Sequence, residues 1–138
     1  MKRLLLSLLI LAGCSDDGSI IDPAIEEMEV LLQVRYSITS NCPNALLSNY
    51  YLGDQEVVIG SAVPLPWDTY RSTILTTVEG VYPAISIKIT ATASGAPPVG
   101  QSKWTKITVH YQLDGEGWIY FSESLGGPAA FFNQDLQI

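Results

Sequence analysis

The sequence contains little charge and few basic residues. Lys, Arg, Asp and Glu make up 15% of its 138 residues, and 7 basic side chains stand against 14 acidic ones, which gives a formal net charge of −7. Because nucleic-acid-binding proteins hold phosphates with Lys and Arg, this balance argues against a nucleic-acid partner. A hydrophobic content of 47%, with only 11 Gly and 8 Pro, is typical of a folded chain. The length allows one domain with appendages.

The chain is also poor in the residues on which most catalytic and metal sites depend. It has one His and 2 Cys, and it contains no G-x-S-x-G, H-E-x-x-H or phosphate-loop motif. His110 falls on the polar side of an alternating segment, which favours an exposed strand residue over a general base. Asp114 and Glu116 are more typical of a solvated hairpin than of a calcium site. The sequence therefore predicts a protein that is not an enzyme and binds no cofactor or metal.

The N-terminus carries an export signal. Lys2 and Arg3 precede an apolar run that ends at Leu11 and is too short to cross a bilayer. The tetrapeptide Leu11-Ala12-Gly13-Cys14 resembles the lipobox of bacterial lipoproteins. That resemblance implies cleavage before Cys14 and attachment of diacylglycerol and acyl chains such as palmitate to this residue, so that lipid holds the protein on a membrane. An ordinary cleaved signal with a Cys nearby is the alternative.

The residues after Cys14 bear on location. Ser15 in place of Asp removes the usual inner-membrane retention signal and favours the outer membrane. The run Ser15-Asp16-Asp17-Gly18 resembles the acidic surface-export signal of Bacteroidetes lipoproteins, although a plain acidic tether would have the same composition. The periplasmic and cell-surface orientations both stay open. We expect a signal peptide over 1–13, a flexible acidic linker over 14–29 and a folded domain over 30–138.

The domain shows the alternation of β-strands. Polar and apolar residues alternate over Val30–Thr39, Ile85–Thr92 and Lys106–Leu113, which predicts three strands with one buried face each. Weaker candidates bounded by turn residues are 45–52, 56–62, 70–78 and 118–122. Asp114-Gly115 is the best hairpin signal. The sequence predicts an all-β, immunoglobulin-like two-sheet β-sandwich of about seven strands, with 126–133 forming a closing strand or an exposed tail.

Several short motifs are similar to a known family. They are Val34-Arg35-Tyr36, Ala45–Tyr51, Pro64-Leu65-Pro66-Trp67, Ala84-Ile85-Ser86-Ile87, Ile107-Thr108-Val109 and Leu113-Asp114-Gly115. In this order they resemble the extracytoplasmic domain of the MmpS family. The resemblance implies a compact β-sandwich that acts as an accessory to an envelope transporter. MmpS proteins are held by a transmembrane helix, whereas this chain carries a lipobox, so a different envelope protein partner is expected.

The aromatic residues offer a second interpretation. Two tryptophans are candidate platforms on which a sugar ring stacks: Trp67, and Trp104, which the alternation places on the polar side of its strand. The alternative is that each packs in the core or at a sheet edge. The main hypothesis is a non-enzymatic accessory or scaffold lipoprotein, and a surface-exposed glycan- or ligand-binding module is the other. If Cys14 is lipidated, Cys42 has no other cysteine in the chain with which to form a disulfide. We expect Cys42 to be buried, and the alternative is an intermolecular disulfide.

Overall fold

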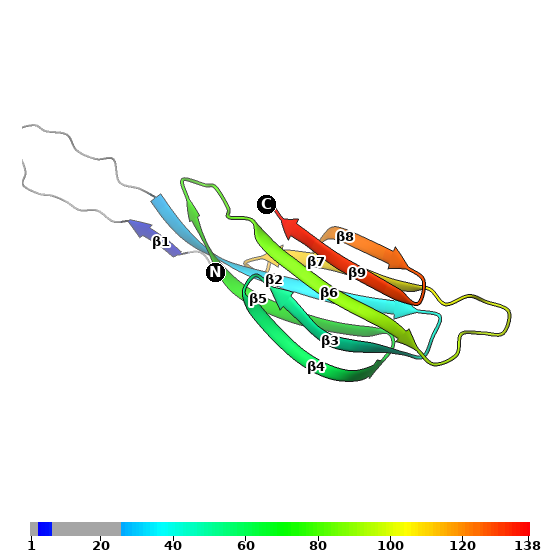
Figure 1. Cartoon of the computed structure of the whole chain (residues 1–138). Helices are drawn as coiled ribbons and strands as arrows, with labels where there is room; N and C mark the ends of the chain where they lie inside the picture. Colours follow the sequence, from blue (N-terminus) through cyan, green and yellow to red (C-terminus); the bar gives the residue numbers. More distant parts are fainter. Residues whose placement is uncertain (1–2, 7–25) are drawn as a thin grey trace, which may run out of the picture.

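The computed structural model describes residues 3–6 and 26–138 of the chain (Figure 1). Every regular element in these ranges is a β-strand. The strands are β1 (Arg3–Leu6), β2 (Glu26–Ser40), β3 (Asn44–Leu52), β4 (Gln55–Pro64), β5 (Trp67–Val78), β6 (Ile85–Ser94), β7 (Thr105–Leu113), β8 (Ile119–Gly126) and β9 (Ala129–Leu136). No helix within these ranges is long and apolar enough to cross a membrane.

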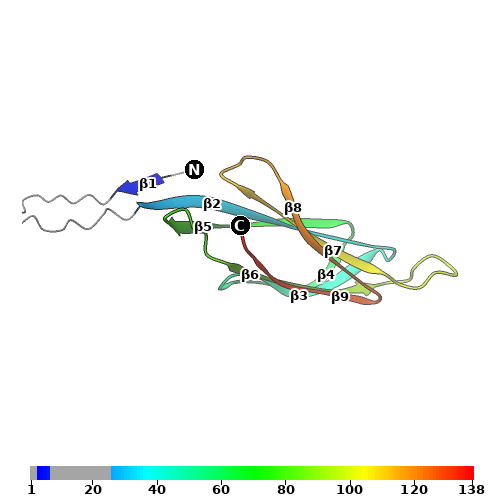
Figure 2. The same cartoon turned by 90° about the horizontal axis from the view of Figure 1, so that it is seen from above.

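The strands form two antiparallel sheets packed face to face, seen edge-on in Figure 2. The first, sheet A, has the order β5-β2-β7-β8, with the short β1 beside the N-terminal end of β2. The second, sheet B, has the order β4-β3-β6-β9. The predicted two-sheet β-sandwich is therefore confirmed. The predicted closing strand is also confirmed, since β9 pairs with β6 at an edge of sheet B.

The core lies between the sheets and is built from the apolar side of each alternation. On β2, Leu32, Val34, Tyr36 and Ile38 are fully buried, while the residues between them face outward. The same period of two buries the inward residues of β6 and β7. Because side chains along a strand point to opposite faces in turn, one face of each sheet closes the core and the other meets solvent. The outer faces of the two sheets are therefore the surfaces that a ligand can reach.

The folded domain begins earlier than expected. Glu26–Glu29, assigned above to the linker, belong to β2, where Glu27 and Met28 pair with Val78 and Thr77 of β5. The pairing is made by backbone N–H and C=O groups, which every residue here carries whatever its side-chain charge, so the acidic composition did not reveal it. Within the expected signal peptide, Arg3–Leu6 forms β1 and pairs with Glu26–Glu29. The rest of that peptide, Cys14 and the linker up to residue 25 lie outside the described residues.

The hairpin predicted at Asp114-Gly115 is confirmed. It joins β7 to β8, and both residues have positive φ, 50° and 74°. Two positive φ values match the twist of the flanking strands, and Gly accepts this conformation without strain. The strand after the hairpin begins at Ile119, so Trp118 lies in the connection and not in the strand. Figure 2 shows this hairpin bending away from sheet B.

Candidate functional site

Four side chains form a row across the outer face of sheet A, one from each strand. The register pairs Tyr70 of β5 with Arg35 of β2, Arg35 with His110 of β7, and His110 with Tyr120 of β8. Directly opposed residues on one face have Cβ atoms about 5 Å apart, so neighbours in the row are in contact distance. The row places a cation and an imidazole between two tyrosines that are 55% and 53% exposed.

A third aromatic ring covers part of this row. The ring of Trp118 lies 5.1 Å from the Arg35 guanidinium carbon and 5.6 Å from the centroid of the Tyr70 ring. At the other end, the rings of His110 and Tyr120 meet edge to face at 5.8 Å. A guanidinium over an indole is held by the ring quadrupole, which fixes the position of both groups. We call Tyr70, Arg35, His110, Tyr120 and Trp118 the aromatic row.

Two polar atoms of the aromatic row lack a hydrogen-bond partner within the described part of the chain. Arg35 Nε and His110 Nδ1 are both buried and have no hydrogen-bond partner among residues 26–138. Burial lowers the pKa of His110, the Arg35 charge lowers it further, and Asp68 opposes both. The lowered pKa favours the neutral imidazole, in which one nitrogen donates and the other accepts.

Hydrogen-bonding side chains flank the aromatic row on both sides. The next row along the strands is Asp68, Ser37, Thr108 and Glu123. On the opposite side, Gln112 donates a hydrogen bond to Gln33 at 2.5 Å. The face thus combines exposed rings with hydroxyl, amide, carboxylate and guanidinium groups. Such a surface suits a ligand that is rich in hydroxyl groups and has apolar C–H faces.

The two tryptophans singled out in the sequence lie elsewhere. Trp104 lies one residue before β7 and is not part of that strand; it is 40% exposed, its N–H donates to Asn41 Oδ1 and its carbonyl accepts from Ser40 Oγ. It is six residues from His110, about 20 Å of extended chain. Trp67 begins β5, is partly buried against the core and meets the ring of Tyr50 edge to face at 5.9 Å.

Sequence reasoning missed Trp118, Tyr70 and Tyr120 as a group. Trp118 was placed inside a strand, and its contact with Arg35 joins residues from distant parts of the chain. The one signal available was the spacing of Trp118 and Tyr120 by two residues, which puts both on the same side of a strand. The assignment of His110 to the polar face of its strand agrees with its position in the row.

Other chemistry is sparse in the part of the chain that the structure describes. It holds no group of three or more His, Cys, Asp or Glu side chains placed to bind a metal ion. Cys42 is 4% exposed, and its N–H donates to Ser40 Oγ at 3.0 Å. The expectation of a buried Cys42 is therefore confirmed.

Comparison with protein-family models, with curated proteins and with solved structures finds no match to this chain. The fold is that of an all-β two-sheet sandwich, and such a fold does not by itself fix a function.

Proposed function

We propose that the protein is a lipid-anchored, non-enzymatic binding protein of the bacterial outer membrane whose β-sandwich holds a glycan on the outer face of sheet A. The observation that carries the proposal is the aromatic row, in which the exposed rings of Tyr70 and Tyr120 stand on either side of Arg35 and His110 on one solvent-facing surface. Pyranose rings present C–H faces to aromatic side chains and hydroxyl groups to Arg, His and Gln. The lipobox at Cys14 supplies the anchor.

The location is tested by protease accessibility of the tagged protein on intact cells and on cells with a permeabilised outer membrane. Cleavage on intact cells supports exposure of the domain at the cell surface and a ligand that is a glycan outside the cell. Protection until permeabilisation places the domain in the periplasm, with an envelope glycan as ligand. A Cys14→Ala variant is expected to leave the membrane fraction, and its full retention there would contradict lipid anchoring.

Binding is tested on a glycan array with the lipidated protein in detergent micelles. Trp118→Ala and Tyr70→Ala are expected to lower affinity at least tenfold for any glycan that the wild type binds, about 1.4 kcal/mol. Trp104→Ala is the matched control, because this exposed Trp lies outside the aromatic row. Thermal melting of each variant shows whether the fold is intact. Equal losses in all three variants, or no glycan bound by the wild type, would count against the proposal.

The second candidate is the accessory or scaffold role that the MmpS-like motifs imply, with another envelope protein as partner. Two of these motifs contribute to the outer face of sheet A, through Arg35 and Thr108. A scaffold role predicts no specific sugar on the array and co-purification of one envelope protein with the lipidated chain. Loss of that protein from the Arg35→Ala variant would support a docking role for the same face.

A further inference from the structure

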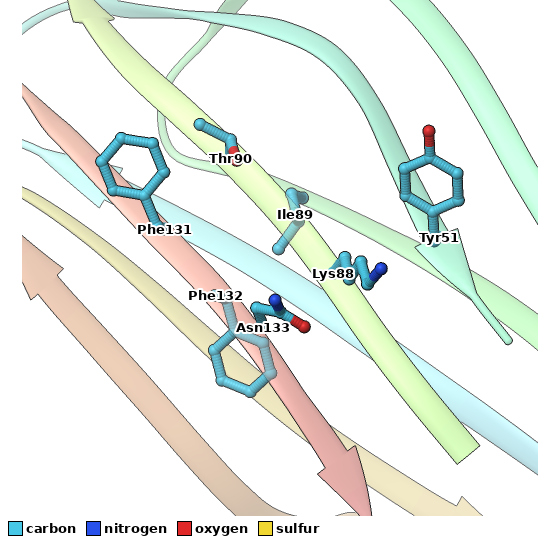
Figure 3. Close-up of a pocket in the computed structure, with 7 residues that line it drawn as sticks. All are labelled: Tyr51, Lys88, Ile89, Thr90, Phe131, Phe132 and Asn133. Atoms are coloured by element: carbon cyan, nitrogen blue, oxygen red, sulfur yellow. The ribbon is translucent and has the colours of Figure 1, made fainter.

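A hollow of about 250 Å³ opens on the other side of the molecule, on the outer face of sheet B (Figure 3). It is lined by residues of β3, β6 and β9, namely Tyr51, Lys88, Ile89, Thr90, Phe131, Phe132 and Asn133. In Figure 3 the rings of Tyr51 and Phe131 lie on opposite sides of β6, with Lys88 and Asn133 between them. The hollow shares no residue with the aromatic row, so its properties are independent of the proposed function.

The strand register fixes which side chains face the hollow together. Lys88 of β6 is opposed by Tyr51 on one side and by Asn133 on the other, and Thr90 is opposed by Phe131. Lys88 and Thr90 are two residues apart on one strand and therefore share its outer face. Phe131 is 68% exposed, whereas its neighbour Phe132 is 2% exposed and belongs to the core. An apolar ring, a hydroxyl, an amide and an ammonium thus surround one space.

The charge of the hollow is positive in an acidic protein. Lys88 is the one charged side chain in its lining, and it forms no ion pair within the described ranges. Glu56 lies beside the hollow, next to Tyr51 in the same row, and is not paired with Lys88: its Oε2 accepts hydrogen bonds from the Tyr51 hydroxyl at 2.8 Å and from Asn49 Nδ2 at 2.7 Å. Asp135 faces the same side of β9 but lies diagonal to Lys88 and outside the hollow.

We propose that this hollow binds the carboxylate-bearing ring of an acidic sugar, such as a hexuronic acid. The ammonium of Lys88 pairs with the carboxylate, the exposed face of Phe131 takes the C–H side of the ring, and Thr90 and Asn133 exchange hydrogen bonds with its hydroxyl groups. A single ammonium matches a monoanion better than a phosphate dianion. The aromatic row and this hollow then hold sugar rings on opposite faces of the sandwich.

The test is a calorimetric titration of the lipidated protein in micelles with an oligogalacturonate, with the matching neutral oligogalactose and with inorganic phosphate. We expect the oligogalacturonate to bind at least tenfold more tightly than the neutral sugar, because a charge-assisted hydrogen bond is worth about a factor of ten or more. Phosphate alone is expected to bind weakly, since it has no ring to place on Phe131. Equal binding of the acidic and neutral sugars would overturn the proposal.

Single substitutions test whether the oligogalacturonate binds in the hollow. Lys88→Gln and Phe131→Ala are each expected to weaken oligogalacturonate binding about tenfold or more, while Lys103→Gln removes the same charge from a loop and leaves it unchanged. Trp118→Ala is expected to have no effect on this ligand. The proposal for the hollow would be overturned if Lys88→Gln bound oligogalacturonate with wild-type affinity, or if only Trp118→Ala lost binding. The glycan array tests the aromatic row independently of this result. Because Lys88 and Phe131 lie on the outer face, both variants are expected to fold.

Discussion

The hydroxyl of Tyr36 donates a hydrogen bond of 2.9 Å to the backbone carbonyl of Tyr51. Tyr36 lies on β2 in sheet A and Tyr51 on β3 in sheet B, so this bond crosses the interior and ties the two sheets together. The ring of Tyr36 is fully buried, with its centroid 5.0 Å from that of Tyr50. A buried hydroxyl needs a partner, and here the partner is the backbone of the opposite sheet.

Replacing Tyr36 by Phe is expected to lower the free energy of unfolding by about 1 kcal/mol, because the ring stays and one buried hydrogen bond is lost. Urea denaturation at pH 7 measures the change. Tyr70→Phe, at an exposed hydroxyl on the outer face, is the control and is expected to stay within about 0.5 kcal/mol of wild type. An unchanged midpoint for Tyr36→Phe would show that the bond between the sheets contributes nothing.

Tyr36 is also expected to contribute to the loss of stability in alkali. Burial raises the pKa of Tyr36 above its ordinary value of 10.0, Tyr50 adds to the shift and Arg71 opposes it. Since the unfolded chain releases this proton first, the contribution to stability is complete below pH 10 and falls as the pH rises above it. We expect the loss of stability between pH 9 and about pH 11 to be smaller in Tyr36→Phe than in wild type. Parallel curves for the two proteins would contradict this assignment.

His110 is expected to titrate below its usual range. Burial lowers its pKa, Arg35 lowers it further and Asp68 raises it. Because the chain has one His, a proton NMR titration of the untagged protein follows it directly. Arg35→Met is expected to raise the pKa and Asp68→Asn to lower it. The folded state binds this proton less well than the unfolded chain, so stability is complete above about pH 6.5 and declines below it. Shifts of the same sign in both variants would refute the charge argument.

Gly95 is expected to tolerate no side chain. It has φ of 95°, and a Cβ there would lie 2.7 Å from Cγ of Pro43. Gly100 in the same loop has φ of 84° with open space around it. Left-handed backbone costs a non-glycine residue about 1 to 2 kcal/mol, so both Gly→Ala variants lose stability. The loss at Gly95 should exceed that at Gly100 because of the Pro43 contact, and equal losses in urea denaturation would show that the contact relaxes freely.

The Cys42 thiol is expected to be unreactive in the folded protein. Its 4% exposure excludes a maleimide reagent, and the lipidated protein should migrate as a monomer on a non-reducing gel. Labelling is expected only after denaturant unfolds the domain. Rapid labelling of the native protein would contradict the burial of this side chain.

The strands with clear alternation were predictable because a half-buried strand repeats every two residues. The apolar residues at every second position predict the buried face of β2 without reference to its partner strands, as Leu32, Val34 and Tyr36 show. The start of the same strand was missed, since Glu26, Glu27 and Glu29 are acidic and this segment is held in the sheet by pairing with β5. Pairing of this kind depends on backbone groups that every residue carries.

The candidate sites were less accessible to sequence reasoning. Aromatic content predicted stacking platforms, but the choice of Trp104 assumed that β7 extends one residue further than it does, and Trp67 lies against the core. The residues that do gather are separated widely in the chain, as Arg35 and Trp118 are. Neither composition nor periodicity reports which strands become neighbours.

The sequence by itself determined the positions and buried faces of the main strands, the turn at Asp114-Gly115 and the prediction of a lipid anchor at Cys14. These depend on local properties: side-chain polarity at every second residue, the φ that Gly accepts and a short linear motif. Only the tertiary structure decided the order β5-β2-β7-β8 and the register that aligns Tyr70, Arg35, His110 and Tyr120. Strand pairing uses the same backbone hydrogen bonds at every residue, so the order and register are fixed by how the apolar faces fill one shared core.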